Sequence, residues 1–495
     1  MSRVPTRVGI LLLALLLAVL GGTPAAQQTA LPFDILPTRE HVEALAAAWN
    51  ARSPYVPGEL IVKFRDGYTP AAQTRALSVL RQRGGLQSRW IGSALLVRAD
   101  DEPDAEVAAQ VLRRQPEIEW AQPNYLIRPR ATPNDSAYPL QWNMTQLDMP
   151  RAWDINPGAN GNVRVAVVDF GVTTVTQTFN FTLWTGSRFE SVPVPVRVNP
   201  DIGAARILPG RDFAFWAGPV VDFDGHGTAV AGTALQETNN AFGTAGVAYG
   251  ATLLPLKACL GYWDIQFLLS AAGIPGFVNP DEETGFCEVS AVVQAVRFAA
   301  DNGAQVINIS LGGPGEAPAF LDALRYAVQR GSFVAMPSGN SFEEGNLTDY
   351  PGAYAAQLDG AVAVGATGRS RRRAYYSNTG SHVELAAPGG DFRDGGTSGG
   401  IVQIGLVPGD SDPFTIIRPR FDRYTELAVQ GTSFSAPHVA GVAALLHAQG
   451  ITSPAAIEAI LKQTATDLGA PGRDNDFGFG LISPRAALRG MGLAR

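Results

Sequence analysis

From about residue 131 onwards, short apolar runs typical of strands alternate with longer runs typical of helices. Neighbouring parallel strands need a crossover connection, and this connection is usually a helix. The alternation therefore predicts an α/β domain with a mostly parallel sheet flanked by helices. The strand-like runs are 163–168, 253–256, 306–309, 333–336 and 361–364, and the helix-like runs are 227–235, 289–301, 320–330 and 437–448. Three stretches interrupt this rhythm and are predicted to be surface insertions: 173–198, 258–287 and 390–428.

A second, smaller domain is predicted before this one, because 495 residues exceed the needs of one ordinary domain. Residues 56–130 contain, in order, strand, helix, strand, strand, helix and strand patterns at 60–64, 69–85, 88–91, 94–97, 103–114 and 118–120. This β-α-β-β-α-β order is that of small ferredoxin-like α+β domains. Residues 27–55 lack a sustained pattern apart from a short helical one over 40–49, and are interpreted as a linker. A breaker-rich connector leads into the larger domain, which we assign to 131–495.

The N-terminus has the pattern of a secretory signal peptide over residues 1–26. Two arginines precede an apolar run from 8 to 20, and small residues follow it. This run is too short to span a bilayer comfortably, so we predict a secreted protein without a membrane anchor, in the extracellular space or the periplasm. Cys259 and Cys287 are expected to form a disulfide in such an oxidising compartment; the alternative is two buried free thiols.

Three segments of the larger domain carry residues suited to nucleophilic catalysis. The run 165–168 ends in Asp169, and in an open α/β sheet functional groups collect beyond the carboxyl ends of the strands. His226 lies between two glycines at the start of an Ala/Val-rich helix, where a neutral imidazole can accept a proton while a carboxylate holds its other nitrogen. Ser433 precedes a helix that Pro437 can begin, and N–H groups at a helix start favour developing negative charge. Singly these residues also fit a turn acid, a packing histidine and an N-cap serine, but their order and flanks favour catalysis.

These segments resemble the Asp, His and Ser boxes of subtilisin-like serine peptidases, a family in which the three residues occur in this chain order. The residues that carry the resemblance are 165–171, 224–232 and 431–441. The resemblance implies a subtilisin-like fold and hydrolysis of peptide bonds. It implies Ser433 as nucleophile, His226 as general base and Asp169 as the residue that orients the histidine. No redox or organic cofactor is implied.

Two further segments are similar to the same family. Residues 334–340 resemble the strand that ends in the oxyanion-hole asparagine, which implies that role for Asn340. Residues 308–313 resemble the segment that pairs with extended substrate and lines the S1 pocket, which holds the side chain before the scissile bond. The substrate-binding residues implied in this way are Ser310, Leu311, Gly312, Ser338 and Gly339. The family often has His where Ala229 stands and Met where Phe434 stands, and neither departure is expected to touch the proton relay.

The smaller domain fits the same family as an inhibitory propeptide. Residues 56–64 and 120–125 resemble the two ends of such a domain. The resemblance implies a zymogen whose propeptide helps the peptidase domain to fold and occupies its cleft until it is cut. We expect autocatalytic cleavage between about Ile127 and Thr132, carried out by Ser433, and a monomeric enzyme that acts on proteins or peptides.

A structural Ca²⁺ site is predicted near the start of the peptidase domain. Residues 132–135 resemble the start of thermophilic members of the family, 199–201 resemble a segment with another carboxylate ligand, and 239–243 resemble the binding loop. Hard oxygen ligands suit calcium. The predicted ligands are the side chains of Asp135, Asp201 and Asn240 and the carbonyls of Phe242 and Thr244. The alternative is an ordinary Asn-Gly-rich loop.

Other functions fit the sequence less well. The formal net charge of −7 gives no excess of basic residues, so nucleic-acid binding is not favoured. A fold alone does not establish activity, so a non-catalytic binding protein of the same fold is the alternative from another class, although every catalytic position is filled. Residues 396–400 match the Gly-x-Ser-x-Gly elbow of α/β-hydrolases, but that motif needs a strand before it and a helix after it. Here a strand-like run, 401–407, follows, so a loop is predicted and Ser398 is rejected as a nucleophile.

Overall fold

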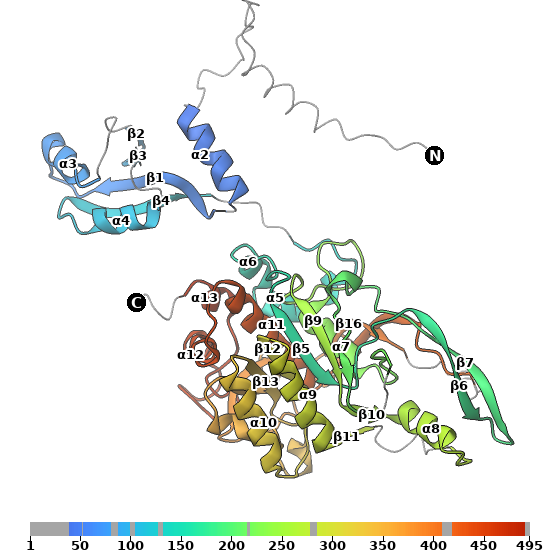
Figure 1. Ribbon diagram of the computed structural model, residues 1–495. Helices are drawn as coiled ribbons and strands as arrows, with labels where there is room; N and C mark the ends of the chain where they lie inside the picture. The colour runs from blue at the N-terminus through green and yellow to red at the C-terminus, as the bar shows by residue number, and fades with distance from the viewer. Residues whose placement is uncertain are drawn as a thin grey trace, which may run out of the picture. The chain divides into compact units, whose positions relative to one another are not determined.

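The computed structural model describes residues 39–51, 53–80, 88–99, 104–126, 132–214, 218–277, 285–407 and 418–490. The predicted signal peptide lies outside these residues. The chain divides into two compact units after Arg128, and each is described by itself (Figure 1). No helix in the ranges given above is long and apolar enough to cross a membrane.

The N-terminal unit is a four-stranded antiparallel sheet with the strand order β2-β3-β1-β4. Its strands are β1 (Tyr55–Phe64), β2 (Ser88–Ile91), β3 (Ala94–Arg98) and β4 (Ile118–Tyr125), and its helices are α2 (Arg39–Asn50), α3 (Pro70–Leu77) and α4 (Ala105–Arg113). Thr69 caps α3 by accepting a hydrogen bond from Ala72 N, and Pro70 takes the first helical position, as predicted. The predicted stop of this helix at Gly84-Gly85 lies outside the described residues. Helix α2 occupies part of the segment interpreted as a linker and packs against β1.

The C-terminal unit contains a seven-stranded parallel sheet, and this confirms the predicted fold class. The strand order is β15-β14-β13-β12-β5-β9-β8, and each of these pairings is parallel. The strands are β5 (Arg164–Asp169), β8 (Arg211–Asp212), β9 (Thr252–Lys257), β12 (Val306–Ile309), β13 (Phe333–Pro337), β14 (Ala361–Thr367) and β15 (Val383–Pro388). The predicted strand-like runs coincide with five of them, and the sequence analysis did not predict β8 and β15.

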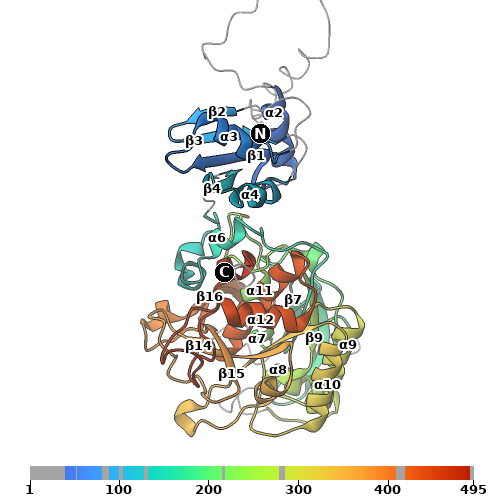
Figure 2. The same cartoon turned by 90° about the vertical axis from the view of Figure 1, so that its left-hand side faces the viewer.

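The central strands separate two apolar cores, because successive side chains of a strand point to opposite faces. In β5, Val165 and Val167 pack in a core with α7 (His226–Leu235) and α11 (Thr432–Ala448). Ala166 and Val168 pack in the other core, with α9 (Val289–Asp301) and α10 (Pro318–Gln329). Helices α9 and α10 lie side by side (Figure 2). A strand that is buried on both faces has a continuous apolar sequence, which explains why β5 could be predicted.

The helix predicted over 437–448 begins earlier, at Thr432. Pro437 therefore lies inside α11 instead of starting it, and Ser433 is the second residue of the helix. Two helices that were not predicted follow, α12 (Pro454–Thr464) and α13 (Pro484–Leu488). The remaining short helices are α5 (Trp142–Gln146), α6 (Met149–Trp153) and the 3₁₀ turns η1 (Tyr138–Leu140), η2 (Ala204–Arg206), η3 (Phe342–Glu344), η4 (Gly352–Gln357) and η5 (Gly396–Gly399).

The described parts of the three predicted insertions form strands and helices that pack together. Their elements are β6 (Gln177–Trp184) and β7 (Phe189–Val196), then β10 (Cys259–Gly261), α8 (Tyr262–Ala271) and β11 (Gly285–Cys287), and lastly β16 (Ile401–Leu406) and β17 (Tyr424–Val429). Hairpin β6–β7 extends beside α8 (Figure 1). We call their shared apolar core the insertion cluster, which consists of Phe181, Leu183, Val192, Val194, Val196, Val221, Phe223, Trp263, Phe267, Leu406 and Phe421.

Candidate active site

The structure brings the predicted acid and base together at the carboxyl edge of the parallel sheet. Asp169 is the last residue of β5, and His226 is the first residue of α7. The buried Oδ1 of Asp169 lies 2.7 Å from His226 Nδ1 and also accepts a hydrogen bond from Phe170 N at 2.8 Å. A carboxylate at this distance accepts a hydrogen bond from Nδ1–H and so favours the tautomer in which His226 Nε2 is the basic nitrogen of the ring.

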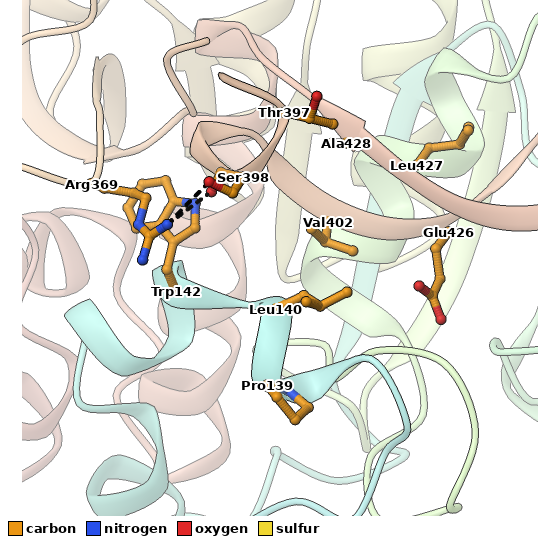
Figure 3. Close-up of a pocket in the computed structure, with 10 residues that line it drawn as sticks. All are labelled: Pro139, Leu140, Trp142, Arg369, Thr397, Ser398, Val402, Glu426, Leu427 and Ala428. Atoms are coloured by element: carbon orange, nitrogen blue, oxygen red, sulfur yellow. Dashed lines mark hydrogen bonds between the residues drawn. The ribbon is translucent and has the colours of Figure 1, made fainter. Parts of the chain in front are cut away.

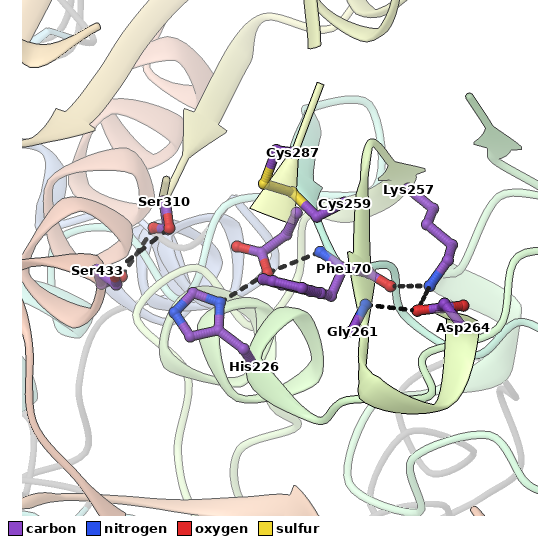
Figure 4. The surroundings of a disulfide bond; sticks show 10 residues. Phe170, His226, Lys257, Cys259, Gly261, Asp264, Cys287, Ser310 and Ser433 are labelled. Carbon is purple, nitrogen blue, oxygen red and sulfur yellow. Dashed lines mark hydrogen bonds and ion pairs between the residues drawn. A yellow bond between two sulfur atoms is a disulfide. The ribbon is translucent and has the colours of Figure 1, made fainter. Parts of the chain in front are cut away.

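Ser310 fixes the surroundings of Ser433 through two hydrogen bonds (Figure 4). The Ser433 hydroxyl donates to the Ser310 carbonyl at 3.3 Å, and the Ser310 hydroxyl donates to the Ser433 carbonyl at 2.8 Å. That carbonyl has no helical partner because Pro437, four residues on, lacks an N–H. Among the described residues, the Ser433 hydroxyl bonds to Ser310 and not to His226. A proton transfer therefore requires the hydroxyl to turn toward the imidazole, as is common before substrate binds.

Asn340 places a free amide beside the start of α11. Its Oδ1 accepts hydrogen bonds from Thr432 N at 2.9 Å and from Thr432 Oγ1 at 2.8 Å. A Cβ added at Gly431 would lie 3.7 Å from Asn340 Nδ2, so this amide nitrogen lies next to the turn before Ser433. Since Thr432 holds the oxygen, Nδ2 remains as a donor, which is what an oxyanion site needs.

Two phenyl rings flank the imidazole of His226. The ring centroids of Phe170 and Phe434 lie 5.8 Å and 5.7 Å from that of the histidine. The expectation that Phe434 does not touch the proton relay was wrong, because its ring packs beside the imidazole. Apolar neighbours keep water from the ring and favour the neutral imidazole.

Two acids before His226, the buried Asp222 and the half-buried Asp224, were not singled out as functional residues in the sequence, although they lie four and two residues ahead of it. Asp222 accepts hydrogen bonds from the backbone N–H groups of Asp224, Gly225 and Thr228 and from the Thr228 hydroxyl. Asp224 Oδ1 accepts from His226 N at 3.0 Å. Burial lowers the pKa of His226, but the charges of Asp169, Asp224 and Asp222 outweigh burial and raise the pKa above its usual value.

A buried ion pair connects the sheet to an insertion beside this site. Lys257, at the end of β9, donates from Nζ to the Phe170 carbonyl at 2.8 Å and to Asp264 Oδ2 at 3.0 Å. Asp264 also accepts from Gly261 N at 2.9 Å. The pair therefore fixes the chain where it leaves Asp169. One sign of this ion pair is present in the sequence, namely the single lysine at the end of an otherwise apolar strand.

The structure joins Cys259 to Cys287 in a disulfide across the β10–β11 pair. Figure 4 shows the bond near Phe170 and His226. A Cβ added at Gly285 would lie 2.4 Å from Phe170 Cε1, so β11 packs directly on that ring. The disulfide thus holds the insertion against the ring that flanks the histidine.

The predicted substrate-binding residues lie just beyond two adjacent strands of the sheet. Ser310, Leu311 and Gly312 follow β12, and Ser338 and Gly339 follow β13. Because β12 and β13 are parallel neighbours, these two segments leave the sheet at the same edge. Ser310 and Ser338 are buried, whereas Gly312 is exposed.

The predicted calcium ligands gather around the loop 239–244, which also holds Phe242 and Thr244. Asp201 accepts from Asn240 Nδ2 at 2.9 Å and from Thr244 N at 2.8 Å, and Asp135 Oδ2 accepts from a backbone N–H of the loop at 2.9 Å. Asp135 Oδ1 is buried and has no partner among the described residues. Burial raises the pKa of Asp201 to about 7, and the charge of Asp135 adds to this rise. The described chain has no group of three His, Cys, Asp or Glu side chains that could hold a metal, so a site here depends on amide and carbonyl oxygens as well.

Ser398 lies in a different place, in the exposed turn η5. Its hydroxyl donates to the Gly395 carbonyl at 2.7 Å and accepts from Arg369. It lines a cavity of about 360 Å³ in which Glu426 lies on the opposite side (Figure 3). No histidine lines this cavity within the described ranges, so Ser398 has no base, in agreement with its rejection as a nucleophile.

A parallel α/β sheet with an acid–histidine pair and a helix-start serine at its carboxyl edge defines a serine peptidase of the subtilisin-like fold. The sequence matches the subtilase family over residues 160–480 and the fervidolysin N-terminal prodomain over residues 42–124. The chain therefore belongs to the subtilase family and carries an N-terminal propeptide domain.

Relatives of known class agree with this assignment. The chain is 30% identical over 425 residues to the thermophilic serine proteinase of Bacillus sp. (strain AK1), a match that covers 86% of each chain. It is 30% identical to an extracellular protease of Xanthomonas campestris pv. campestris, over 87% of this chain and 72% of the relative. A solved protease from Pseudoalteromonas arctica PAMC 21717 aligns with a TM-score of 0.52 and 28% identity, over 72% of this chain and 99% of the other. The predicted enzyme class, a subtilisin-like serine peptidase, is thereby confirmed.

Proposed function

We propose that this peptidase is a secreted, self-processing endopeptidase that uses Ser433, His226 and Asp169 as a catalytic triad. The observation that carries the proposal is the 2.7 Å contact between His226 Nδ1 and the buried Asp169, at the sheet edge where β12 holds Ser433 through Ser310. Kinship with an extracellular protease and the signal-peptide pattern support secretion.

The reaction would proceed by acyl transfer. Ser433 Oγ attacks the peptide carbonyl as His226 Nε2 takes its proton, and Asp169 stabilises the imidazolium that forms. The imidazolium returns the proton to the leaving amine, which departs with the C-terminal part of the substrate. Water then attacks the acyl-enzyme by the same route in reverse and regenerates Ser433.

Two N–H donors would stabilise the tetrahedral intermediate. Asn340 Nδ2 is free because Thr432 holds the amide oxygen, and the Ser433 N–H lies in the first turn of α11. Both donors are fixed before reaction, which is the condition for strong electrostatic stabilisation of an oxyanion. The segment 310–312 would hold the substrate in an extended form by strand addition.

A fluorophosphonate probe tests the assignment of the nucleophile. We expect covalent labelling of the mature protein at Ser433, located by peptide mapping, and a large loss of labelling rate in His226→Ala. The matched control is Ser398→Ala, which should label like the wild type. A folded wild-type protein that is not labelled would instead be the non-catalytic binding protein of the same fold.

The N-terminal unit would act as the inhibitor of its own peptidase domain and be removed by it. The match to a prodomain over 42–124 supports this, and the predicted cut between about Ile127 and Thr132 falls directly after the matched range. Wild-type protein should lose this unit during maturation, and N-terminal sequencing of the product would locate the cut.

We also propose a structural Ca²⁺ held by Asp135, Asp201 and Asn240 with carbonyls of the loop 239–244. The buried, unpartnered Oδ1 of Asp135 beside this oxygen-rich loop supports the fit. A bound ion would tie the mature N-terminus to the loop. Chelation should lower the melting temperature of the wild type, and added Ca²⁺ should restore it. In Asp135→Asn the chelator should have little effect, while an unchanged wild-type melting temperature would favour an ordinary loop.

A further inference from the structure

One carboxylate oxygen outside the proposed triad is buried and has no hydrogen-bond partner among the described residues. Asp349 lies in the chain between β13 and β14 and is partly exposed, but its Oδ1 is buried. Its side chain makes no hydrogen bond or ion pair with any other residue that the structure describes. Burial raises its pKa to about 6. A carboxylate oxygen that is buried without a partner costs stability, so its presence here calls for an explanation.

Asp349 lies between the two segments that are predicted to line the S1 pocket. A Cβ added at Gly312 would lie 1.8 Å from Asp349 Oδ1, so the carboxylate rests directly on the face of that glycine. A Cβ added at Gly339 would lie 2.7 Å from Asp349 Cβ. Gly313 and Tyr350 exchange backbone hydrogen bonds of 2.9 Å and 2.8 Å, which hold Asp349 at this place. The acid therefore lies between the two segments that are predicted to line the S1 pocket, and the backbone bonds between Gly313 and Tyr350 hold it there.

We propose that Asp349 makes the S1 pocket specific for a basic side chain, so that the enzyme cleaves after arginine or lysine. The proposal rests on the peptidase function and the S1 assignment given above. A guanidinium or ammonium group satisfies a carboxylate by a charge-assisted hydrogen bond. A substrate without such a group leaves the acid desolvated and unpaired, and sites of this kind reject such substrates strongly.

The sequence of the connector agrees with this specificity. Within the predicted maturation window, Arg128 and Arg130 are the charged residues. The bond after Arg128 leads to Pro129, whose nitrogen has no N–H for pairing with an adjacent strand. The bond between Arg130 and Ala131 is therefore the expected cut, and it would give a mature chain that begins at Ala131.

The test compares internally quenched peptides that differ at one position, Arg, Lys, Gln, Phe or Ala before a single scissile bond. We expect kcat/KM for Arg and Lys to exceed that for the other three by about 10- to 100-fold, the worth of a hydrogen bond to a charged group. Asp349→Asn should reduce the Arg-to-Phe ratio by a similar factor. Glu344→Gln removes the same charge from an exposed position nearby and should keep the ratio.

Fluorophosphonate labelling of Ser433 separates this proposal from the function on which it rests. A wild type that labels but prefers Phe, Gln or Ala would overturn the specificity and leave the triad intact. An Asp349→Asn variant that labels and keeps the Arg preference would also overturn it. A second variant, Asp349→Ser, provides the same comparison if the amide disturbs packing. A wild type that neither labels nor cleaves any peptide would overturn the proposed function itself.

Discussion

The parallel sheet and the insertion cluster of the peptidase domain differ in how clearly their elements can be recognised in the sequence. Five strands of the sheet, β5, β9, β12, β13 and β14, repeat one local pattern, an apolar run buried on both faces. The insertion cluster joins the three insertions and a fourth segment that holds Val221 and Phe223, so that Phe421 packs against Phe223 and Phe267. The sheet presents the proposed reacting groups, whereas the insertions support them through the Lys257–Asp264 pair and the contact of β11 with Phe170. Reactivity and support therefore belong to different parts of the molecule, and substitutions should affect them separately.

The largest effect is expected for the proposed reacting groups that the sheet presents. Ser433→Ala should lower kcat by about 10⁶-fold, the loss known for subtilisin itself when its nucleophile is removed. The same variant should accumulate as a precursor that lacks only the signal peptide, since the nucleophile needed for the cut is gone. Gel analysis of the secreted protein with a peptide assay measures both. Pure Ser433→Ala protein that still processes itself would show that another residue is the nucleophile.

The next effect tests the link between the two regions. Lys257→Met leaves the buried Asp264 without its cation and should lower the free energy of unfolding by about 3–5 kcal/mol. The double variant Lys257→Met/Asp264→Leu should recover much of this loss, because no unpaired charge remains. Arg325→Met breaks an exposed pair with Asp322 and should cost less than about 1 kcal/mol. Calorimetry of the fluorophosphonate-blocked enzymes gives these values, and equal costs for the two single variants would contradict the prediction.

A somewhat smaller effect is expected within the insertion. The disulfide joins cysteines 28 residues apart, and the chain-entropy model gives the closure of such a loop about 3–4 kcal/mol of stabilisation. Cys259→Ser/Cys287→Ser should therefore lower the melting temperature while the fluorophosphonate still labels Ser433. Mass spectrometry should find no free thiol in the mature wild type, and two free thiols would contradict the pairing.

The smallest effect concerns the charges around the imidazole. His226 must be neutral to accept a proton, so activity is lost as the pH falls through its pKa, which nearby acids raise against the effect of burial. Asp224→Asn removes one of these charges and should move the acid limb of kcat/KM to lower pH by about one unit. Asp322→Asn, on the exposed face of α10, should leave the limb in place. If the acid limb of Asp224→Asn moved to higher pH, the Asp224 charge would not raise the pKa of His226, and the prediction would be contradicted.

The sheet was predictable, and the proposed triad could be named, because each carries a local signal. The run 306–309 coincides with β12, since burial on both faces makes the strand apolar throughout. Asp169 and His226 follow a buried strand and begin a helix, so their separate positions already indicated one edge of the sheet. The start of α11 was predicted wrongly, because Pro437 usually marks a first helical turn and here lies inside the helix.

The insertion cluster and Asp349, the proposed S1 acid, were not predictable, because neither has a periodic or motif signal. Phe421 and Phe223 are far apart in the chain, and periodicity carries no information on which stretches meet. Asp349 stands in a segment without strand or helix pattern, and its meaning comes from packing between Gly312 and Gly339. Residues of this kind are recognised from contacts and from unsatisfied polar atoms.

The bond from the Ser310 hydroxyl to the Ser433 carbonyl has a consequence for how this site tolerates change. Pro437 has no N–H, so the Ser433 carbonyl cannot accept the usual helical hydrogen bond from that residue. The backbone of Ser433 is therefore held by Ser310, which follows β12, in place of that helical bond. The later turns of α11 can then bend or be repacked by substitution while the nucleophile keeps its position relative to His226. The position of Ser433 relative to His226 should therefore depend little on substitutions in the later turns of α11.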